Sequence, residues 1–211
     1  TITTPVANSL TFAMSSNLSS GSSDEAWGVR NLVVTASAKN YMSTYSGLNL
    51  NAGSGNVTFA GGMGATKAVG NLSLTGSAIS AAAVKVWDTG SLTVTNSANS
   101  SITGVISGGI SLTKAGTGAL TLSGANTYTG STTVSAGTLV VGGSGSFNSG
   151  SYSGALSVAS GATFTYSSSA NQTFASSSTT TGLVAGAGTV NLNESGTVTI
   201  SGDQAFTGAL N

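Results

Sequence analysis

Short runs in which apolar and small polar residues alternate recur along the chain of 211 residues. Leu72-Ser-Leu74 and Leu92-Thr-Val94 are two examples, and many runs are followed within a few residues by Gly, Asn or Ser. Alternation at period two is typical of a strand with one buried face, and no 3.6-residue periodicity accompanies it. The pattern therefore predicts an all-β protein. Further runs begin at Leu10, Leu32, Leu48, Val57, Ile110, Leu120, Leu139, Leu156, Phe164, Val190 and Val198.

The spacing of these runs indicates how the strands are arranged. Runs often start about 15–22 residues apart, which is more than a two-residue hairpin needs and less than a βαβ unit requires. Such spacing fits a solenoid whose coils each contribute two or three short strands. At roughly 20 residues per coil and about 4.8 Å between coils, residues 1–211 would form a single rod of about ten coils, near 50 Å long.

One stretch, residues 110–141, is the most regular part of the chain, and residues 190–211 resemble part of it. Leu120-Thr-Leu-Ser-Gly124 matches Val198-Thr-Ile-Ser-Gly202, and Tyr128-Thr-Gly130 matches Phe206-Thr-Gly208. The chain is therefore interpreted as a diverged repeat protein with a degenerate second copy at 190–211.

Three stretches depart from the pattern. Residues 21–31 and 77–90 each contain one of the two tryptophans, and both are predicted to be loops or decorations on the rod. Within the second stretch, residues 84–87 alternate and favour a strand. Residues 142–154 are rich in Gly and Ser and are predicted to be a flexible turn that projects from the coil.

Composition narrows the possible partners and locations. The chain has five basic and five acidic residues, so it offers no basic patch for nucleic acid. No apolar run is long enough for a membrane-spanning helix. There is no Cys, which is compatible with an exported protein. The chain starts with Thr1 and shows no signal-peptide region, so we expect a processed or trimmed chain.

The regular stretch resembles the autotransporter-associated β-strand repeat, which is found in passenger domains of bacterial autotransporters. The resemblance rests on Leu112-Thr-Lys114, Gly116-Thr-Gly118, Leu120-Thr-Leu-Ser-Gly124, Asn126-Thr-Tyr-Thr-Gly130, Thr132-Thr-Val134 and Ala136-Gly-Thr-Leu139. It implies a right-handed parallel β-helix at the cell surface or outside a bacterium. We therefore expect this chain to be passenger material only, without the family's outer-membrane barrel. In the second copy, Asn126 and Tyr128 are replaced by Gln204 and Phe206.

No group of residues predicts an enzyme, a cofactor or a metal site. Without His, neither a Ser-His-Asp triad nor a common zinc site can form. Ser111 and Lys114 match an S-x-x-K motif, but residues three apart on a strand point to opposite faces, so Lys114 is expected to be a solvated turn residue. Gly-rich segments at 116–118 and 142–145 lack the context of a phosphate-binding loop. Asp24-Glu25 is interpreted as a solvated pair, and glycosidase chemistry would need two facing carboxylates among Asp88, Glu194 and Asp203.

The two tryptophans are the candidate ligand or loop contacts. Trp27 and Trp87 could stack on sugar rings, although packing over the flank of the core is favoured for a Trp in a short irregular segment. Cell-surface or host glycans and proteins are the external partners that we consider.

Two functions remain open within an extracellular structural β-solenoid. One is an adhesive or structural rod; the other is a filament subunit in which the head of one chain supplies a strand to the tail of the next. A secreted carbohydrate-binding or polysaccharide-degrading β-helix is the alternative. The candidate subunit contacts are Thr3, Val6, Leu10, Phe12, Phe206 and Leu210.

Overall fold

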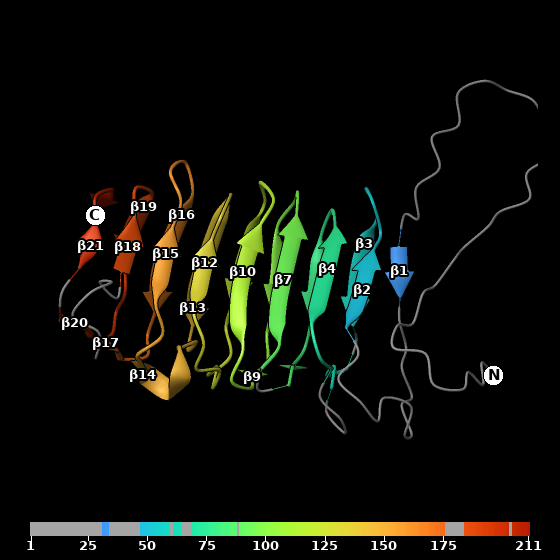
Figure 1. The fold of residues 1–211 in the computed structure, drawn as a ribbon, viewed down its shortest axis with the longest axis horizontal. Helices are drawn as coiled ribbons and strands as arrows, with labels where there is room; N and C mark the ends of the chain where they lie inside the picture. The colour runs from blue at the N-terminus through green and yellow to red at the C-terminus, as the bar shows by residue number, and fades with distance from the viewer. Residues whose placement is uncertain are drawn as a thin grey trace, which may run out of the picture.

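The structure, a computed structural model, describes residues 31–33 (backbone only), 47–59, 61–64, 69–87, 89–175, 184–202 and 204–211. In these ranges the chain forms a parallel β-solenoid, because strands of successive coils pair side by side in the same direction. Two long sheets form its broad sides, and short strands form a third side (Figure 1). All strand pairs in the described part of the chain are parallel, which confirms the predicted all-β solenoid.

The eight-stranded sheet is called the front sheet, and the nine-stranded one the back sheet. The front sheet consists of β2 (Leu48–Asn51), β4 (Leu72–Gly76), β7 (Ser91–Asn96), β10 (Ser111–Ala115), β12 (Thr132–Val134), β15 (Leu156–Val158), β18 (Val184–Gly186) and β21 (Ala205–Phe206). The back sheet consists of β1 (Asn31–Val33), β3 (Asn56–Phe59), β5 (Ile79–Ala81), β8 (Ser100–Ile102), β11 (Ala119–Leu122), β13 (Thr138–Gly143), β16 (Thr163–Ser168), β19 (Thr189–Leu192) and β22 (Ala209–Leu210).

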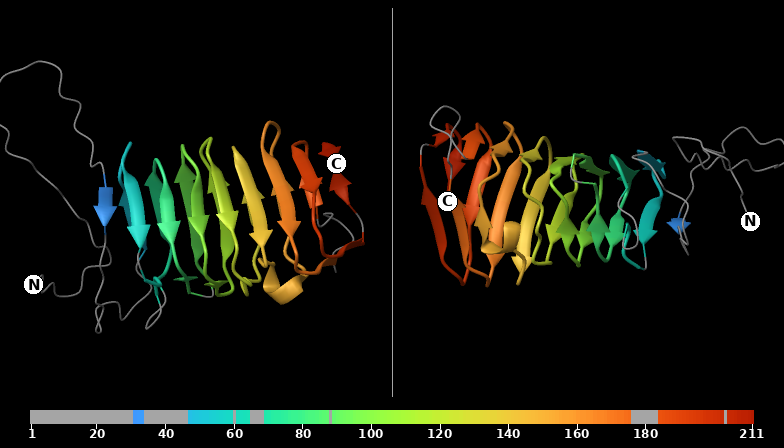
Figure 2. Two further views of the ribbon diagram at one scale, coloured as in Figure 1. Left: turned by 180° about the vertical axis from the view of Figure 1, so that it is seen from behind. Right: turned by 60° about the horizontal axis from the view of Figure 1, so that its bottom comes forward.

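The third side is built from shorter pieces. One pair consists of β6 (Val84–Lys85) and β9 (Ile106–Ser107), and a three-stranded sheet consists of β14 (Ser151–Tyr152), β17 (Gln172–Ala175) and β20 (Val198–Ser201). A 3-10 turn, η1 (Asn148–Gly150), precedes β14. Figure 2 (right) turns this side toward the viewer.

The coil is right-handed and makes about seven turns in the described part of the chain. In Figure 1 the front strands point upward, and the chain crosses over the top to the back sheet as it advances from right to left. This is the usual hand for a crossover between parallel strands. The expectation of ten coils assumed that every coil has the same number of residues. In the structure the coils differ in length: the paired residues Leu112 and Thr132 are 20 residues apart in sequence, whereas Leu139 and Phe164 are 25 apart.

The core consists of side chains stacked in files along the axis. Leu72, Leu92 and Leu112 lie next to one another in three consecutive front strands, and each is at most 1% exposed. Their neighbours in sequence point outward, as the alternation predicted. Full burial of such a side chain contributes about 1.5–3 kcal/mol, so the rod is stabilised by the sum of many contacts between neighbouring coils.

Two segments that were expected to be decorations are part of the coil. Residues 77–90 contain β5 and β6, so the strand expected at 84–87 is confirmed for Val84–Lys85, and the loop expected for the rest is wrong where β5 forms. Residues 142–154 are not a projecting turn: Gly142 and Gly143 end β13, and Phe147 and Tyr152 are fully buried. The aromatic side chains tie this Gly-rich segment to the core. Residues 21–30 of the other segment lie outside the described residues.

The match between 120–130 and 198–208 is not a structural correspondence. Leu120 lies in the back sheet, whereas Val198 lies on the third side. Phe206 pairs with Gly186, and its file continues to Val158 in the front sheet rather than to Tyr128. The two segments look alike in sequence because a period-two pattern occurs on all three sides of the coil.

Candidate interaction surface

The interior of the solenoid is filled with side chains, including a cluster of aromatic rings. Phe147 lies at the centre, with ring centroids 5.8 Å from Tyr128, 5.1 Å from Tyr152 and 5.9 Å from Phe164. All of these rings are fully buried. A ligand must therefore be recognised on the outer surface in this part of the rod.

Hydroxyl groups within the cluster bond to one another. Thr132 Oγ1 lies 2.8 Å from both the Tyr128 and the Tyr152 hydroxyls, and Tyr152 donates to Gly130 O at 2.6 Å. Burial is the main reason that the pKa of each tyrosine lies above its usual value. The two phenols stay protonated and act as structural donors.

Lys114 is buried, which contradicts the expectation of a solvated turn residue. Its side chain occupies the inward file of β10, and Nζ donates to the carbonyls of Ala115 at 2.7 Å, Gly116 at 2.9 Å and Ala136 at 3.2 Å. Burial lowers its pKa to about 8. The ammonium thus links the corners of two successive coils, and Ser111 points away from it, as strand geometry predicted.

The front and back sheets present smooth, uncharged faces in the described part of the rod. Lys114 is the one charged residue among their described strands, and it points inward. The outward positions of the front sheet carry small side chains in one file, namely Asn49, Ser73, Thr93, Thr113, Thr133, Ser157, Ala185 and Ala205.

The third side accommodates the variation in coil length. The length of the path from the back sheet to the front sheet is compared between paired residues. It runs from Leu122 to Thr132 in one coil, and from their partners Val141 to Leu156 in the next. The connection from front to back changes by only one residue over the following coils, at 134–139 and 158–164. Loops that differ between coils are a common location for binding groups on a regular scaffold.

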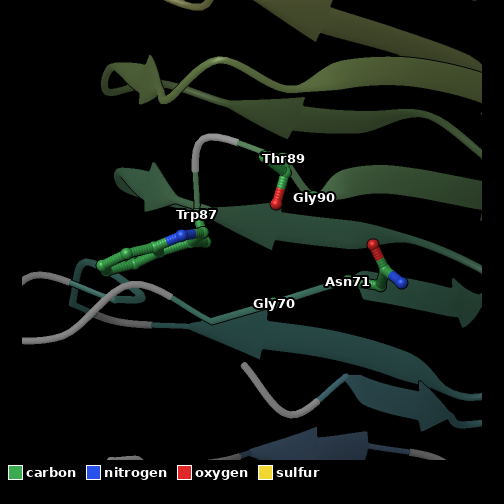
Figure 3. Close-up of a pocket in the computed structure, with 5 residues that line it drawn as sticks. All are labelled: Gly70, Asn71, Trp87, Thr89 and Gly90. Carbon is green, nitrogen blue, oxygen red and sulfur yellow. The ribbon is translucent and has the colours of Figure 1, made fainter. Parts of the chain in front are cut away.

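A shallow hollow lies beside Trp87, where the third side meets the front sheet (Figure 3). It has a volume of about 110 Å³ and is lined by Gly70, Asn71, Trp87, Thr89 and Gly90. The indole is 44% exposed, although packing over the core was the favoured expectation. In Figure 3 the Thr89 hydroxyl lies between the indole and the Asn71 amide.

Lys85 lies on the same outward side of the chain as Trp87. Both residues are exposed and Val86 between them is buried, as the alternation at 84–87 predicts. For this stretch the sequence interpretation named Trp87 as a contact and did not name Lys85. The period-two pattern contained the signal for Lys85, because residues two apart on a strand share a face.

The other candidate residues are only partly placed. Thr3, Val6, Leu10, Phe12 and Trp27 lie outside the described residues, so the structure does not test their roles. Phe206 and Leu210 lie in β21 and β22, in the last described coil; Phe206 is partly buried and Leu210 is 60% exposed.

The acidic residues do not form a site in the described part of the chain. Glu194 is partly buried, while Asp24, Glu25, Asp88 and Asp203 are outside the described residues. No group of three or more metal-binding side chains occurs in the described ranges. Within the same ranges, no helix is long and apolar enough to cross a membrane.

Comparison with known proteins identifies the regular stretch. No curated protein and no solved structure matched the chain. A family model described as the passenger-associated-transport-repeat matches residues 112–141, which run from β10 to β13. The β-solenoid and this repeat together fit an autotransporter passenger domain. Residues 112–141 are therefore a passenger-associated-transport-repeat, as the resemblance in the sequence predicted.

Proposed function

We propose that this protein is a non-enzymatic structural and adhesive segment of an autotransporter passenger, located at the bacterial surface or outside the cell. The repeat at 112–141 supports the passenger assignment. The adhesive role is supported by a difference between the sides of the rod. The two sheets present uncharged outer faces, whereas the third side has longer connections and the exposed Trp87. The stacked coils hold the third side in a rigid arrangement.

Surface display tests this function. The chain is fused to an outer-membrane carrier in a non-adherent bacterium, and binding to host-cell monolayers and glycan-coated surfaces is compared with that of the carrier alone. We expect adhesion above the carrier control for at least one surface. Equal binding of both strains to all surfaces would contradict the adhesive role.

An assay with the purified protein tests the enzymatic alternative. Purified chain is incubated with plant and bacterial polysaccharides, and released reducing ends are measured. We expect no release above the buffer control. Time-dependent release that scales with protein concentration would contradict a non-enzymatic role.

End-to-end association is the second candidate, and the exposed apolar end of the described rod favours it. The last strands of the three sides, β20, β21 and β22, have no partner on their outer edges among the described residues. Leu210 is 60% exposed there, whereas Val190 and Phe164 in its file are at most 2% exposed. Unpaired strand edges and apolar surface favour the addition of another coil, whether a second chain or a continuation of this chain supplies it.

Analytical ultracentrifugation tests this candidate. We expect the sedimentation coefficient of the wild type to rise with concentration and that of Leu210→Asp to stay constant. Phe206→Asp should act in the same way. A monomer at all concentrations, or association that both variants retain, would rule out this interface.

A further inference from the structure

We propose that the surface formed by Trp87, Lys85 and the adjoining hollow binds an acidic glycan, with the indole against a sugar ring and the Lys85 ammonium against a carboxylate. This inference rests on the adhesive function proposed above and names the ligand class for one part of the third side.

The geometry first shows that the two side chains can contact one ligand. They are separated by Val86, whose side chain is buried in the core. Two steps along an extended strand cover about 7 Å. A ring on Trp87 and a carboxylate on the same or the next sugar residue can therefore be contacted together.

The indole supplies the apolar contact. Its exposed fraction of 44% compares with full burial of Phe147, Phe164 and Tyr128 in the same rod. An exposed tryptophan presents a large rigid face that costs little conformational entropy to order. Sugar rings present faces of C–H groups that pack on such a surface.

Polar groups for sugar hydroxyls line the hollow. Asn71 Oδ1 accepts hydrogen bonds from Ser91 N at 3.0 Å and Ser91 Oγ at 3.2 Å, which fixes the orientation of the amide. Its Nδ2 group has no hydrogen-bond partner among the described residues, and neither has the Thr89 hydroxyl. Both are thus available as hydrogen-bonding groups beside the indole.

The exposed ammonium of Lys85 favours an acidic ligand over a neutral one. Three charged residues lie in the described part of the chain: Lys85 is exposed, Lys114 is buried and Glu194 is partly buried. Among the described residues, Lys85 is therefore the exposed cation. A single cation suits one carboxylate rather than the repeated phosphates of a nucleic acid, which require many cations.

The size of the hollow favours an oligosaccharide over a protein or a small enclosed ligand. Its volume of about 110 Å³ is well below the roughly 300–1,000 Å³ of pockets that enclose drug-sized ligands. Trp87 and Val105 are the exposed large apolar side chains on the described third side, and two separate residues are too few for the apolar centre of a protein interface. A sugar chain that lies across the surface needs only one such ring.

Calorimetric titration of the whole chain tests the proposal. The probes are tetragalacturonate, a glucuronate-containing tetrasaccharide and the carboxyl-reduced neutral counterpart of each. We expect the wild type to bind at least one acidic probe more tightly than its neutral counterpart. The difference should shrink as salt is raised, because an exposed ion pair is screened.

Two variants separate the roles of the two side chains. Trp87→Ala should weaken binding of the acidic and the neutral probe at least tenfold. Lys85→Gln should weaken only the acidic probe, by up to about fivefold, which corresponds to the roughly 1 kcal/mol of an exposed ion pair. Val105→Ala, an exposed position on the same side, serves as the control and should leave binding unchanged.

Absence of binding to both acidic probes would overturn the proposal, as would binding that Trp87→Ala leaves intact. Circular dichroism of each variant verifies that the solenoid is folded. If displayed cells adhere but Trp87→Ala has no effect, the ligand assignment fails and the adhesive function stands. If displayed cells adhere to no surface, the adhesive function itself fails.

Discussion

The hydroxyl of Tyr128 lies 2.8 Å from Thr132 Oγ1, inside the solenoid where neither group contacts water. Thr132 occupies a file that Leu112 fills one coil earlier and Leu156 one coil later. A polar residue is accommodated in this apolar file because two tyrosine hydroxyls bond to it. The three hydroxyl groups therefore form a buried cluster in which each has a hydrogen-bond partner. A substitution that removes one of these partners should destabilise this coil.

Thr132→Val should destabilise the protein by about 2–3 kcal/mol, because the buried Tyr128 hydroxyl loses its partner. Tyr152 retains its bond to Gly130 O, so the loss falls mainly on Tyr128. Urea denaturation measures the change. Thr133→Val is the matched control, because Thr133 points outward from the same strand and should change stability by less than about 0.5 kcal/mol. Equal effects would show that Thr132 is not in the core.

The stability of the protein should rise between about pH 8 and pH 10. Burial lowers the pKa of Lys114 from 10.5 to about 8, so in this range the unfolded chain binds more protons than the folded chain, and a rise in pH favours folding. Above pH 10 the sign reverses, because the raised pKa values of Tyr128 and Tyr152 leave the folded state with more protons.

Chemical denaturation at a series of pH values measures this profile. Lys114→Met should remove the rise between pH 8 and 10 and leave the decrease above pH 10. A rise that persists in this variant would show that another group causes it.

Gly116→Ala should be more destabilising than Gly161→Ala, although the two glycines have similar φ values of 76° and 78°. A Cβ at residue 116 would collide with the backbone of Asn96 in the neighbouring coil, whereas nothing lies within 4 Å of one at residue 161. We expect a loss of about 1–2 kcal/mol at residue 161 from backbone strain alone and at least about 3 kcal/mol at residue 116. Thermal denaturation compares the two variants. Similar losses would contradict the close stacking of these corners.

The third side should tolerate insertions better than the corner between the front and back sheets. Three residues inserted after Ser144, which is exposed, should lower the melting temperature by only a few degrees. The same insertion after Ala136 should abolish cooperative unfolding, because Lys114 Nζ binds Ala136 O and holds this corner to the previous coil. Calorimetry distinguishes the two, and equal tolerance would mean that the coil has no preferred side for variation.

The sequence predicts the strand files well where apolar residues repeat. Leu92 and Leu112 lie in adjacent strands because each begins an alternating run followed by turn residues. Periodicity also places Lys114 on the same face as Leu112, but the usual preference of lysine for water favoured the opposite interpretation. The three carbonyls that receive its ammonium become apparent only when the coils are stacked.

Other features depend on contacts that a single sequence does not specify. The Gly- and Ser-rich stretch at 142–154 looks flexible, yet Phe147 and Tyr152 anchor it in the core. The apparent second repeat failed because Val198 and Leu120 share a pattern but occupy different sides of the coil. Trp87 is exposed rather than packed over the core, and its role as a contact stays a prediction. Lys85 attracts attention only because it shares the outward face of Trp87.

Site-directed blocking tests whether the rigid solenoid presents its third side for adhesion. The chain has no cysteine, so one can be introduced at Lys85 on the third side, Thr113 on the front sheet or Thr121 on the back sheet. Each displayed variant is coupled to a bulky maleimide polymer, and adhesion is measured before and after coupling. We predict that coupling at Lys85→Cys abolishes adhesion while coupling at Thr113→Cys and Thr121→Cys leaves it unchanged. Full adhesion after coupling at residue 85, or its loss after coupling at 113 or 121, would show that adhesion does not depend on the third side.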